Sequence, residues 1–272
     1  LLCNTSIADL CDVLQYLIES NPTSLRLADA SGGTALHLAC QNKNMDPKIV
    51  EMIVTAWPEA THQQDEGGDL PIHDLCSNNE MGDAAALDIL NFLLKKDPQL
   101  VRETNDNGHL PIHLAACNKS LEFCKVLIDV YPESVMFVTS SGKLLIHYAC
   151  RWGRVDTVEC LFELYPESIN VADHHGFLPI HFTSLGDGEE KMSIVRYLLL
   201  QDPDLAAKAD TRGRLPLHLA CSRERERMRR ETSSLADLNA VKVLFDAYPE
   251  GIYTNDRDGN TPVPGIDRGL AE

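Results

Sequence analysis

One spacing recurs along the whole chain and constrains its fold more than any other feature. A proline is followed ten residues later by a glycine, and five residues after that by a histidine. The spacing occurs at Pro22/Gly32/His37, Pro58/Gly68/His73, Pro98/Gly108/His113, Pro132/Gly142/His147, Pro166/Gly176/His181 and Pro203/Gly213/His218. A seventh copy, Pro249/Gly259, has Pro264 at the histidine position. A fixed offset at this period indicates one supersecondary unit copied in tandem, in which each copy buries its apolar side against its neighbours.

The copy that starts at residue 173 shows what the unit contains. Residues 173–176 (DHHG) predict a turn in which glycine supplies a positive φ. Pro179 suits the first turn of a helix, so residues 180–184 are expected to form a short apolar helix. Residues 193–201 have apolar residues at helical spacing, so they are expected to form an amphipathic second helix, which Pro203 ends. Each unit is therefore predicted to be a turn and two antiparallel helices.

The length of the unit varies only between its histidine and the proline of the next copy. From histidine to the next proline there are 21, 25, 19, 19, 22 and 31 residues, so insertions fall near the connection between the two helices. The longest insertion, residues 222–239, has two interpretations. It is either a solvated helical extension with Glu/Arg pairing, or a basic docking segment, since five arginines stand against two glutamates in residues 223–230.

Charge and hydropathy limit the partners and the compartment. The net charge is −17, and residues 1–136 carry 8 basic against 20 acidic residues, whereas residues 137–272 carry 16 against 21. This balance disfavours nucleic acid and an anionic membrane as partners, and favours a protein partner with a basic surface. No apolar run reaches the roughly 18 residues that span a bilayer. The first residues include acids and lack a basic stretch, so no secretory signal is expected.

The nine cysteines follow the repeat rather than a disulfide pattern. Cys40, Cys76, Cys150 and Cys221 stand three residues after a repeat histidine, and Cys117 stands four after. Equivalent positions in stacked helices lie about 8–10 Å apart, beyond the roughly 7 Å that a disulfide tolerates between Cα atoms. We expect small buried thiols and an intracellular, cytoplasmic protein, with the nucleus as the alternative compartment.

These units resemble the ankyrin repeat family. A turn of the Asp-x-x-Gly type precedes a T-P-L-H-x-A-like motif in a unit of about 34 residues. The motif stands here as 34–39 (TALHLA), 70–73 (LPIH), 110–116 (LPIHLAA), 144–147 (LLIH), 178–181 (LPIH) and 215–220 (LPLHLA). The resemblance covers nearly the whole chain and implies an all-α solenoid of helix-turn-helix units with short β-turn fingers.

Two departures from the family pattern concern the ends of the helices. Five of the six full units have leucine where the family usually has threonine, so the hydroxyl that pairs with the histidine is expected to be lost there. Proline replaces the glycine that usually ends the second helix. The aromatic rings that precede it are expected to fasten the helix end to its neighbour; they are Trp57, Tyr131, Tyr165 and Tyr248.

The chain shows no constellation that predicts catalysis. The histidines occur once per unit, so neighbouring rings are too far apart to share a metal, and we expect them to bond the turn backbone instead of binding an ion. His174 and His175 with Asp173 form a local group that suits an exposed recognition tip better than a metal site. Cys124 and Cys160 lack an evident base. No catalytic residue, cofactor or metal is therefore expected, and enzyme activity is a distant third hypothesis.

In ankyrin stacks the turn tips and the exposed end of the first helix line a groove. The resemblance implies that partners bind there. Phe177, Trp152, Arg151 and Arg212 are the preferred anchors, because buried aromatics and arginines dominate interface energetics. The alternative is that these side chains have no binding role, because single exposed aromatics are common on protein surfaces. The full set of expected partner-binding residues is Ser31, Glu66, Asp69, Asp106, Asn107, His109, Lys143, Arg151, Trp152, His174, His175, Phe177, Arg212 and Arg214.

The sequence therefore predicts a non-catalytic, monomeric protein–protein interaction scaffold that forms one domain over residues 1–272. The expected divisions are a partial unit 1–28, full units at about 29–64, 65–104, 105–138, 139–172, 173–209 and 210–255, and a partial unit 256–272. The alternative is a regulatory ankyrin module of a larger multidomain protein whose activity lies outside this segment. Neither end shows a convincing polar cap.

Overall fold

The structure is a computed structural model, and it describes residues 7–152, 154–185, 190–229 and 235–264. Within these ranges the chain forms α-helices, short 3-10 helices and turns, with no strand, so the expected all-α fold is confirmed. The chain divides into two compact units, Leu1–Ser134 and Val135–Glu272. The single domain over residues 1–272 stays a prediction.

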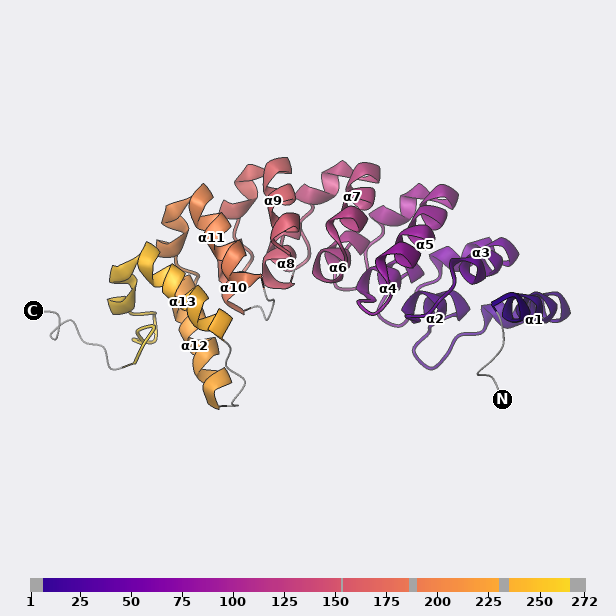
Figure 1. Cartoon of the computed structure of the whole chain (residues 1–272), viewed down its shortest axis with the longest axis horizontal. Helices are drawn as coiled ribbons and strands as arrows, with labels where there is room; N and C mark the ends of the chain where they lie inside the picture. The colour runs from indigo at the N-terminus through magenta and orange to yellow at the C-terminus, as the bar shows by residue number, and fades with distance from the viewer. Residues whose placement is uncertain (1–6, 153, 186–189, 230–234, 265–272) are drawn as a thin grey trace, which may run out of the picture. The chain divides into compact units, whose positions relative to one another are not determined.

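The first unit is a stack of helix pairs (Figure 1). Its helices are α1 (Ile7–Ser20), α2 (Ala35–Gln41), α3 (Pro47–Ala56), α4 (Pro71–Ser77), α5 (Asp83–Lys96), α6 (Pro111–Asn118) and α7 (Leu121–Val130). The first helices of successive repeats pack on one another, α2 on α4 and α4 on α6, and the second helices α1, α3, α5 and α7 pack in the same order. The core between the two rows is apolar, with Leu36, Ile72 and Phe123 fully buried.

The second unit repeats this arrangement (Figure 1). Its helices are α8 (Leu145–Trp152), α9 (Val155–Leu164), α10 (Pro179–Leu185), α11 (Lys191–Gln201), α12 (Pro216–Arg229) and α13 (Leu235–Ala247). Helix α10 packs between α8 and α12, and α11 packs between α9 and α13. The predicted helices at 180–184 and 193–201 are found slightly longer, as α10 and α11. The connection at residues 186–189 lies outside the described residues.

The longest insertion begins as helix. Helix α12 runs from Pro216 to Arg229, about twice the length of α10, so the first half of the 222–239 segment extends the first helix of its repeat. This agrees with the helical-extension interpretation. Residues 230–234 and the side chains of 223–238 lie outside what the structure describes, so the basic-docking interpretation stays a prediction.

A feature that the sequence reasoning did not predict follows each second helix. The proline that ends the helix starts a five-residue 3-10 helix; these are Pro22–Arg26, Pro58–His62, Pro98–Arg102, Pro132–Met136, Pro166–Asn170, Pro203–Ala207 and Pro249–Tyr253. Proline fits the first position because its φ is already near the helical value and its missing N–H needs no partner. The 3-10 turn buries apolar residues such as Leu100 and Leu205 against the stack.

The residue before this proline marks the end of the helix. Tyr165, for example, follows α9 with φ −147° and ψ 80°, a non-helical conformation that ends the helix. Two of the expected aromatic fastenings involve an arginine from the preceding repeat. Arg102 lies 4.0 Å from the centroid of the Tyr131 ring, and Arg26 lies 5.9 Å from that of Trp57.

We call the five-residue turn before each first helix a finger, as at residues 173–177. The repeat histidines hold each finger to its helix, as predicted. In the repeat of α10, the Nδ1 of His181 accepts from the backbone N–H of Leu178 at 3.1 Å, and its Nε2 donates to the carbonyl of Arg214 in the next finger at 3.3 Å. Since Nδ1 accepts, the proton lies on Nε2 and the ring is neutral. The ring is fully buried, and burial lowers its pKa to about 4.

The leucines at the threonine position remove the hydroxyl contact with the histidine and leave the backbone contact in place. In the one repeat that keeps threonine, both the hydroxyl and the backbone N–H of Thr34 contact His37 Nδ1, at 2.9 and 3.1 Å. The leucine repeats lack the hydroxyl contact but keep the backbone one, as from Leu70 to His73 at 3.1 Å. The hydroxyl pairing is therefore lost in the leucine repeats, as expected, while the backbone contact with the histidine remains.

Candidate partner-binding site

The fingers are rigid because their backbone polar groups are bonded internally. In the finger at residues 173–177, the Asp173 carboxylate accepts from the backbone N–H groups of His175 and Phe177, both at 2.9 Å. The N–H of Gly176 donates to the Asp173 carbonyl at 2.9 Å, and the backbone of Asp173 also donates to Phe177 at 3.0 Å. The same pattern recurs in the finger that starts at Asp210.

Neighbouring fingers are also bonded to one another within each unit. In the first unit, Glu66 N–H donates to Ser31 at 2.9 Å, and Asp106 N–H donates to Gly67 at 3.1 Å. In the second unit, His174 donates to Ser141 at 3.2 Å and Arg257 to Arg212 at 2.8 Å, again between main chains. A finger therefore offers a partner its side chains, on a backbone that is already satisfied.

The expected tip residues of the first unit divide into two groups. Ser31, Glu66, Asp106 and Asn107 are exposed, as expected of contact residues. Asp69 and His109 are half-buried and contribute to the stack itself. The carboxylate of Asp69 accepts from the Asn105 amide at 2.8 Å, and its carbonyl and that of His109 accept from His37 and His73.

Asp74 is a residue of this unit that the sequence reasoning missed. It stands on α4 directly after His73, is only 8% exposed, and its Oδ2 has no hydrogen-bond partner within the described residues. Burial raises the pKa of the Asp74 carboxyl to about 6, and the nearby carboxylates Asp69 and Asp65 act in the same direction. The available signal was its position, because the same phase holds Leu, Tyr or Phe in the other full repeats.

In the second unit, four expected residues are exposed at the surface. His174, His175, Arg212 and Trp152 are exposed, with Trp152 at 42%. Arg151 lies half-buried beside Trp152, with its guanidinium carbon 4.9 Å from the ring centroid. Its Nε atom is buried and has no hydrogen-bond partner within the described residues.

Three further expected residues meet in a row of alternating cations and rings. Lys143 lies 5.5 Å from the Phe182 ring, which packs edge-on against Phe177 at 5.7 Å. Arg214 in turn lies 5.2 Å from the Phe177 ring. Phe182 and Tyr148 stand at the same phase of their repeats; Phe182 is buried in the core, and Tyr148 is half-buried. The row orients Lys143 and Arg214 on the finger side of the unit.

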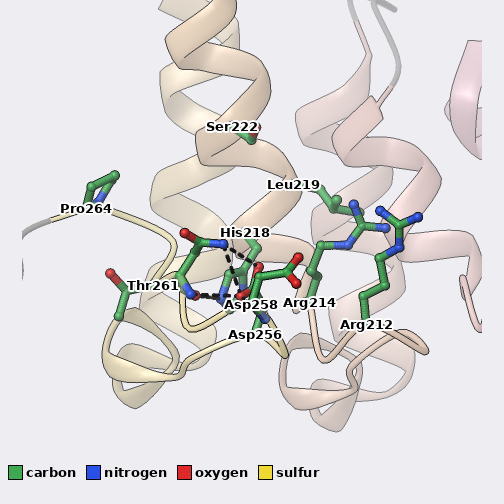
Figure 2. A pocket seen from close by; sticks show the side chains of 10 residues that line it. Arg212, Arg214, His218, Leu219, Ser222, Asp256, Asp258, Thr261 and Pro264 are labelled. Atoms are coloured by element: carbon green, nitrogen blue, oxygen red, sulfur yellow. Dashed lines mark hydrogen bonds between the residues drawn. The ribbon is translucent and has the colours of Figure 1, made fainter.

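A pocket of about 240 Å³ lies between the fingers at 210–214 and 256–260 (Figure 2). It is lined by Arg212, Arg214, His218, Asp256, Asp258 and Thr261, among others. The two arginine side chains lie next to each other on one side, and the aspartates lie on the facing finger.

The described residues do not suggest metal binding or thiol chemistry. Among them, no group of three or more His, Cys, Asp or Glu side chains could hold a metal ion. Cys40, Cys76, Cys150 and Cys221 are buried, as expected, whereas Cys117 is half-buried. Burial raises the pKa of the Cys40, Cys76 and Cys150 thiols, which keeps them protonated and unreactive. None of the helices in the described part is long and apolar enough to cross a membrane.

These features define a repeat protein whose stacked helices present rigid, variable fingers. Comparison with known proteins gives the family. Residues 81–173 match the family model described as ankyrin repeats (3 copies). The fold is similar to the crystal structure of the ankyrin repeat domain of Bcl-3, a member of the IkappaB protein family, with a TM-score of 0.55 at 20% identity over 76% of this chain and 86% of that one. Residues 81–173 therefore match ankyrin repeats, and the fold is that of an ankyrin repeat domain.

A curated relative is the tyrosine-protein kinase HTK16 of Hydra vulgaris, which is 35% identical over 108 residues. The matched part is 38% of this chain and only 13% of the kinase. Ankyrin repeats are in general protein–protein interaction modules, and their fold is typically non-catalytic.

Proposed function

We propose that the chain is a non-catalytic interaction scaffold, and that it binds a protein partner through its finger tips and the exposed ends of its first helices. The observation that carries this proposal is the division of labour within each finger. The main chain is bonded internally and to the next finger, while side chains such as His174 and Arg212 stay exposed. A rigid backbone with variable side chains lowers the entropic cost of binding.

The residues predicted from the sequence are the contact set of this proposal. The exposed Trp152 stacks with the half-buried Arg151, and Phe177 belongs to the cation–ring row. Arginines and aromatics of this kind contribute most binding energy once a partner covers them. Asp69 and His109 are half-buried and support the fingers, so they are expected to contribute less than Glu66 or Asp106.

Site-specific crosslinking tests the proposal. A photoreactive amino acid at Ser31, His174 or Arg212 is expected to crosslink a co-purified partner, which mass spectrometry then identifies. Leu200 is 80% exposed on α11, the second helix of its repeat, and serves as the matched control position. Crosslinks from Leu200 or from the 222–239 segment, with none from the fingers, would contradict the proposal.

A second candidate is a regulatory ankyrin module within a larger protein. The kinase relative favours it, because the matched repeats occupy a small part of that protein. The test is the coding sequence on either side of these residues. A kinase or other catalytic domain in the same reading frame would support the module, and stop and start codons directly at the ends would contradict it.

The partner's charge, the oligomeric state and the compartment complete the proposal. The acidic fingers of the first unit, with Asp65, Glu66, Asp69 and Asp106, favour a basic partner surface there. The chain is proposed to be monomeric and intracellular, in the cytoplasm or the nucleus. Light scattering tests the mass against 30.2 kDa, and cell fractionation tests the location.

A further inference from the structure

The pocket between the last two fingers contains one arginine held in place and one arginine without a side-chain partner. Arg214 donates from Nε and Nη2 to the Asp210 carboxylate, at 2.8 and 2.7 Å, and stacks over the Phe177 ring. The backbone of Arg212 is fixed at both ends, because its N–H donates to Asp210 at 2.8 Å and its carbonyl accepts from Arg257 at 2.8 Å. Its guanidinium has no hydrogen-bond or ion-pair partner within the described residues.

The facing finger does not neutralise Arg212. Asp256 uses its Oδ1 to accept from the N–H groups of Asp258 and Asn260, at 3.0 and 2.8 Å, and these bonds lower the pKa of its carboxyl. His218 at the base is neutral, since Nδ1 accepts from Leu215 and Nε2 donates to backbone carbonyls. Asp258 is exposed, and its carboxylate bonds no side chain in the described part of the chain. Among the described residues, one carboxylate without a side-chain partner therefore faces one guanidinium without a partner across the pocket (Figure 2).

The volume and the charges limit the ligand. About 240 Å³ is less than the roughly 300–1,000 Å³ of typical small-molecule sites, and suits a single side chain with a stretch of backbone. Arg212 offers the planar pair of donors that matches a carboxylate. Asp258 repels a second negative charge and can accept a backbone N–H.

We propose that this pocket binds one aspartate or glutamate side chain of an extended partner segment, with Arg212 as the main contact and Asp258 as the group that limits the site to a single negative charge. Arg214 is a positioning residue, because Asp210 and Phe177 hold it beside the pocket. This inference rests on the proposed function, and it adds a partner chemistry opposite to that expected for the acidic fingers of the first unit.

NMR titration of the full chain at 150 mM salt tests the proposal. The probes are three peptides that differ in one residue type, acetyl-(Ser-Glu)3-amide, acetyl-(Ser-Gln)3-amide and acetyl-(Ser-Lys)3-amide. The Glu peptide is expected to shift the Arg212 Nε–H and the backbone signals of 210–214 and 256–260, and the Gln peptide is not. Equal shifts with the Gln and Glu peptides would overturn the proposal.

Three single variants separate the pocket from general electrostatics. Arg212→Gln is expected to weaken Glu-peptide binding about tenfold, because a charge-assisted bond is lost. Arg257→Gln removes the same charge from the neighbouring finger but from outside the pocket, and is expected to change binding less than about twofold. Asp258→Asn is expected to strengthen binding about two- to threefold. All three positions are exposed, so the fold is expected to be retained.

The outcomes also distinguish this inference from the proposed function. Equal weakening by R212Q and R257Q, or no tightening in D258N, would reject the pocket. If the Glu peptide fails while the Lys peptide shifts the fingers at 65–69 and 105–109, the finger scaffold stands and the carboxylate site falls. If a crosslinked partner contacts only second helices, the proposed function fails first.

Discussion

A buried imidazole whose two nitrogens bond two different backbone segments connects the start of a first helix to the segment that follows the second helix. His147 accepts from Leu144 at 2.9 Å and donates at 3.1 Å to the carbonyl of Val171, in the segment that leads into the next finger. It is fully buried, so no water replaces these bonds if the ring is removed. The histidine that attracts attention as possible chemistry is therefore a structural group.

The first prediction concerns this ring. His147→Ala is expected to destabilise the fold by about 2–4 kcal/mol, since two backbone groups lose their partner and a cavity remains. Chemical denaturation followed by circular dichroism measures the change. The control is His174→Ala, at an exposed tip, where the change is expected to stay within about 0.5 kcal/mol. A similar effect in both variants would contradict the structural role.

The second prediction is the acid response of the histidines. Burial lowers the pKa of His147 and His181 to about 4, and also lowers that of His73 and His218. Below about pH 6.5 the unfolded chain takes up protons that the folded chain does not, so stability falls as the pH drops from 6.5 towards 4. Each of the first two histidines contributes at most about 3 kcal/mol to this loss. Urea midpoints between pH 7.5 and 4.5 measure it.

The third prediction has the opposite sign and concerns Asp74. Its pKa is raised to about 6 from 3.8, so the ionised carboxylate destabilises the fold above pH 6 and this cost disappears towards pH 4. Asp74→Asn is expected to stabilise the protein by about 1–2 kcal/mol at pH 7.5 and to have little effect near pH 4. Asp88→Asn removes the same charge from an exposed position on α5 and is the control. A stabilisation that is equal at both pH values would contradict the explanation.

Residue roles differ in how far the sequence predicts them. The histidine bonds follow from a motif that fixes ring and backbone within four residues, so the sequence predicts them. The state of Asp74 depends on helices α2 and α4 meeting around it, a contact between distant segments. The sequence shows that an aspartate stands at an unusual position of the repeat. It does not predict that Oδ2 has no hydrogen-bond partner among the described residues.

At the scale of the element, the finger holds most of the residues that we propose contact a partner. Its glycine needs a positive φ, 82° at Gly142, and it lies close to the next finger. A Cβ on Gly142 would lie 2.8 Å from the backbone nitrogen of His174, so two separate costs act at this position.

The fourth prediction separates these costs. Gly142→Ala is expected to destabilise by about 2–3 kcal/mol, from both backbone strain and crowding. Gly259 has φ 80°, but a Cβ added there would meet no atom of another residue within 4 Å. Gly259→Ala is therefore expected to cost about 1 kcal/mol, from strain alone. Thermal unfolding of the two variants compares them, and equal costs would show that finger contact contributes nothing.

The sequence predicts the elements unevenly. The turns and both helices follow from local signals such as Asp173, Gly176 and Pro179, and their bounds agree within two residues. The 3-10 helices were missed, because a proline after a helix predicts where that helix ends and does not by itself predict a tighter helix beyond it. The cation–ring row was missed as well, since Lys143, Phe182 and Arg214 come from three different repeats.

At the scale of the whole molecule, the finger charge differs between the two units. The fingers at 29–33, 65–69 and 105–109 carry acidic side chains and no lysine or arginine, while those of the second unit include Lys143, Arg212, Arg214 and Arg257. Composition alone indicates one acidic protein and one expected partner charge. Knowing which residues reach the fingers gives two surfaces of different chemistry.

The fifth prediction concerns how a local defect spreads. In a repeat stack each repeat contacts its neighbours only, so the His147→Ala defect is expected to act locally. Amide hydrogen exchange is expected to rise most in α8 and α10 and less in α13 of the same unit. A uniform rise over α8, α10 and α13 would indicate that the second unit unfolds in a single step.

The constant distance of 15 residues from proline to histidine has a practical consequence. Because every length change falls outside that interval, each finger joins the stack in the same register whatever its five residues are. The five-residue finger sequences can therefore be exchanged between repeats. Replacing the 210–214 sequence DTRGR by DEGGD, the sequence at 65–69, would exchange a carboxylate-binding tip for an acidic one without moving a helix. Evolution or protein design can therefore change the ligand of such a protein by replacing one finger sequence at a time.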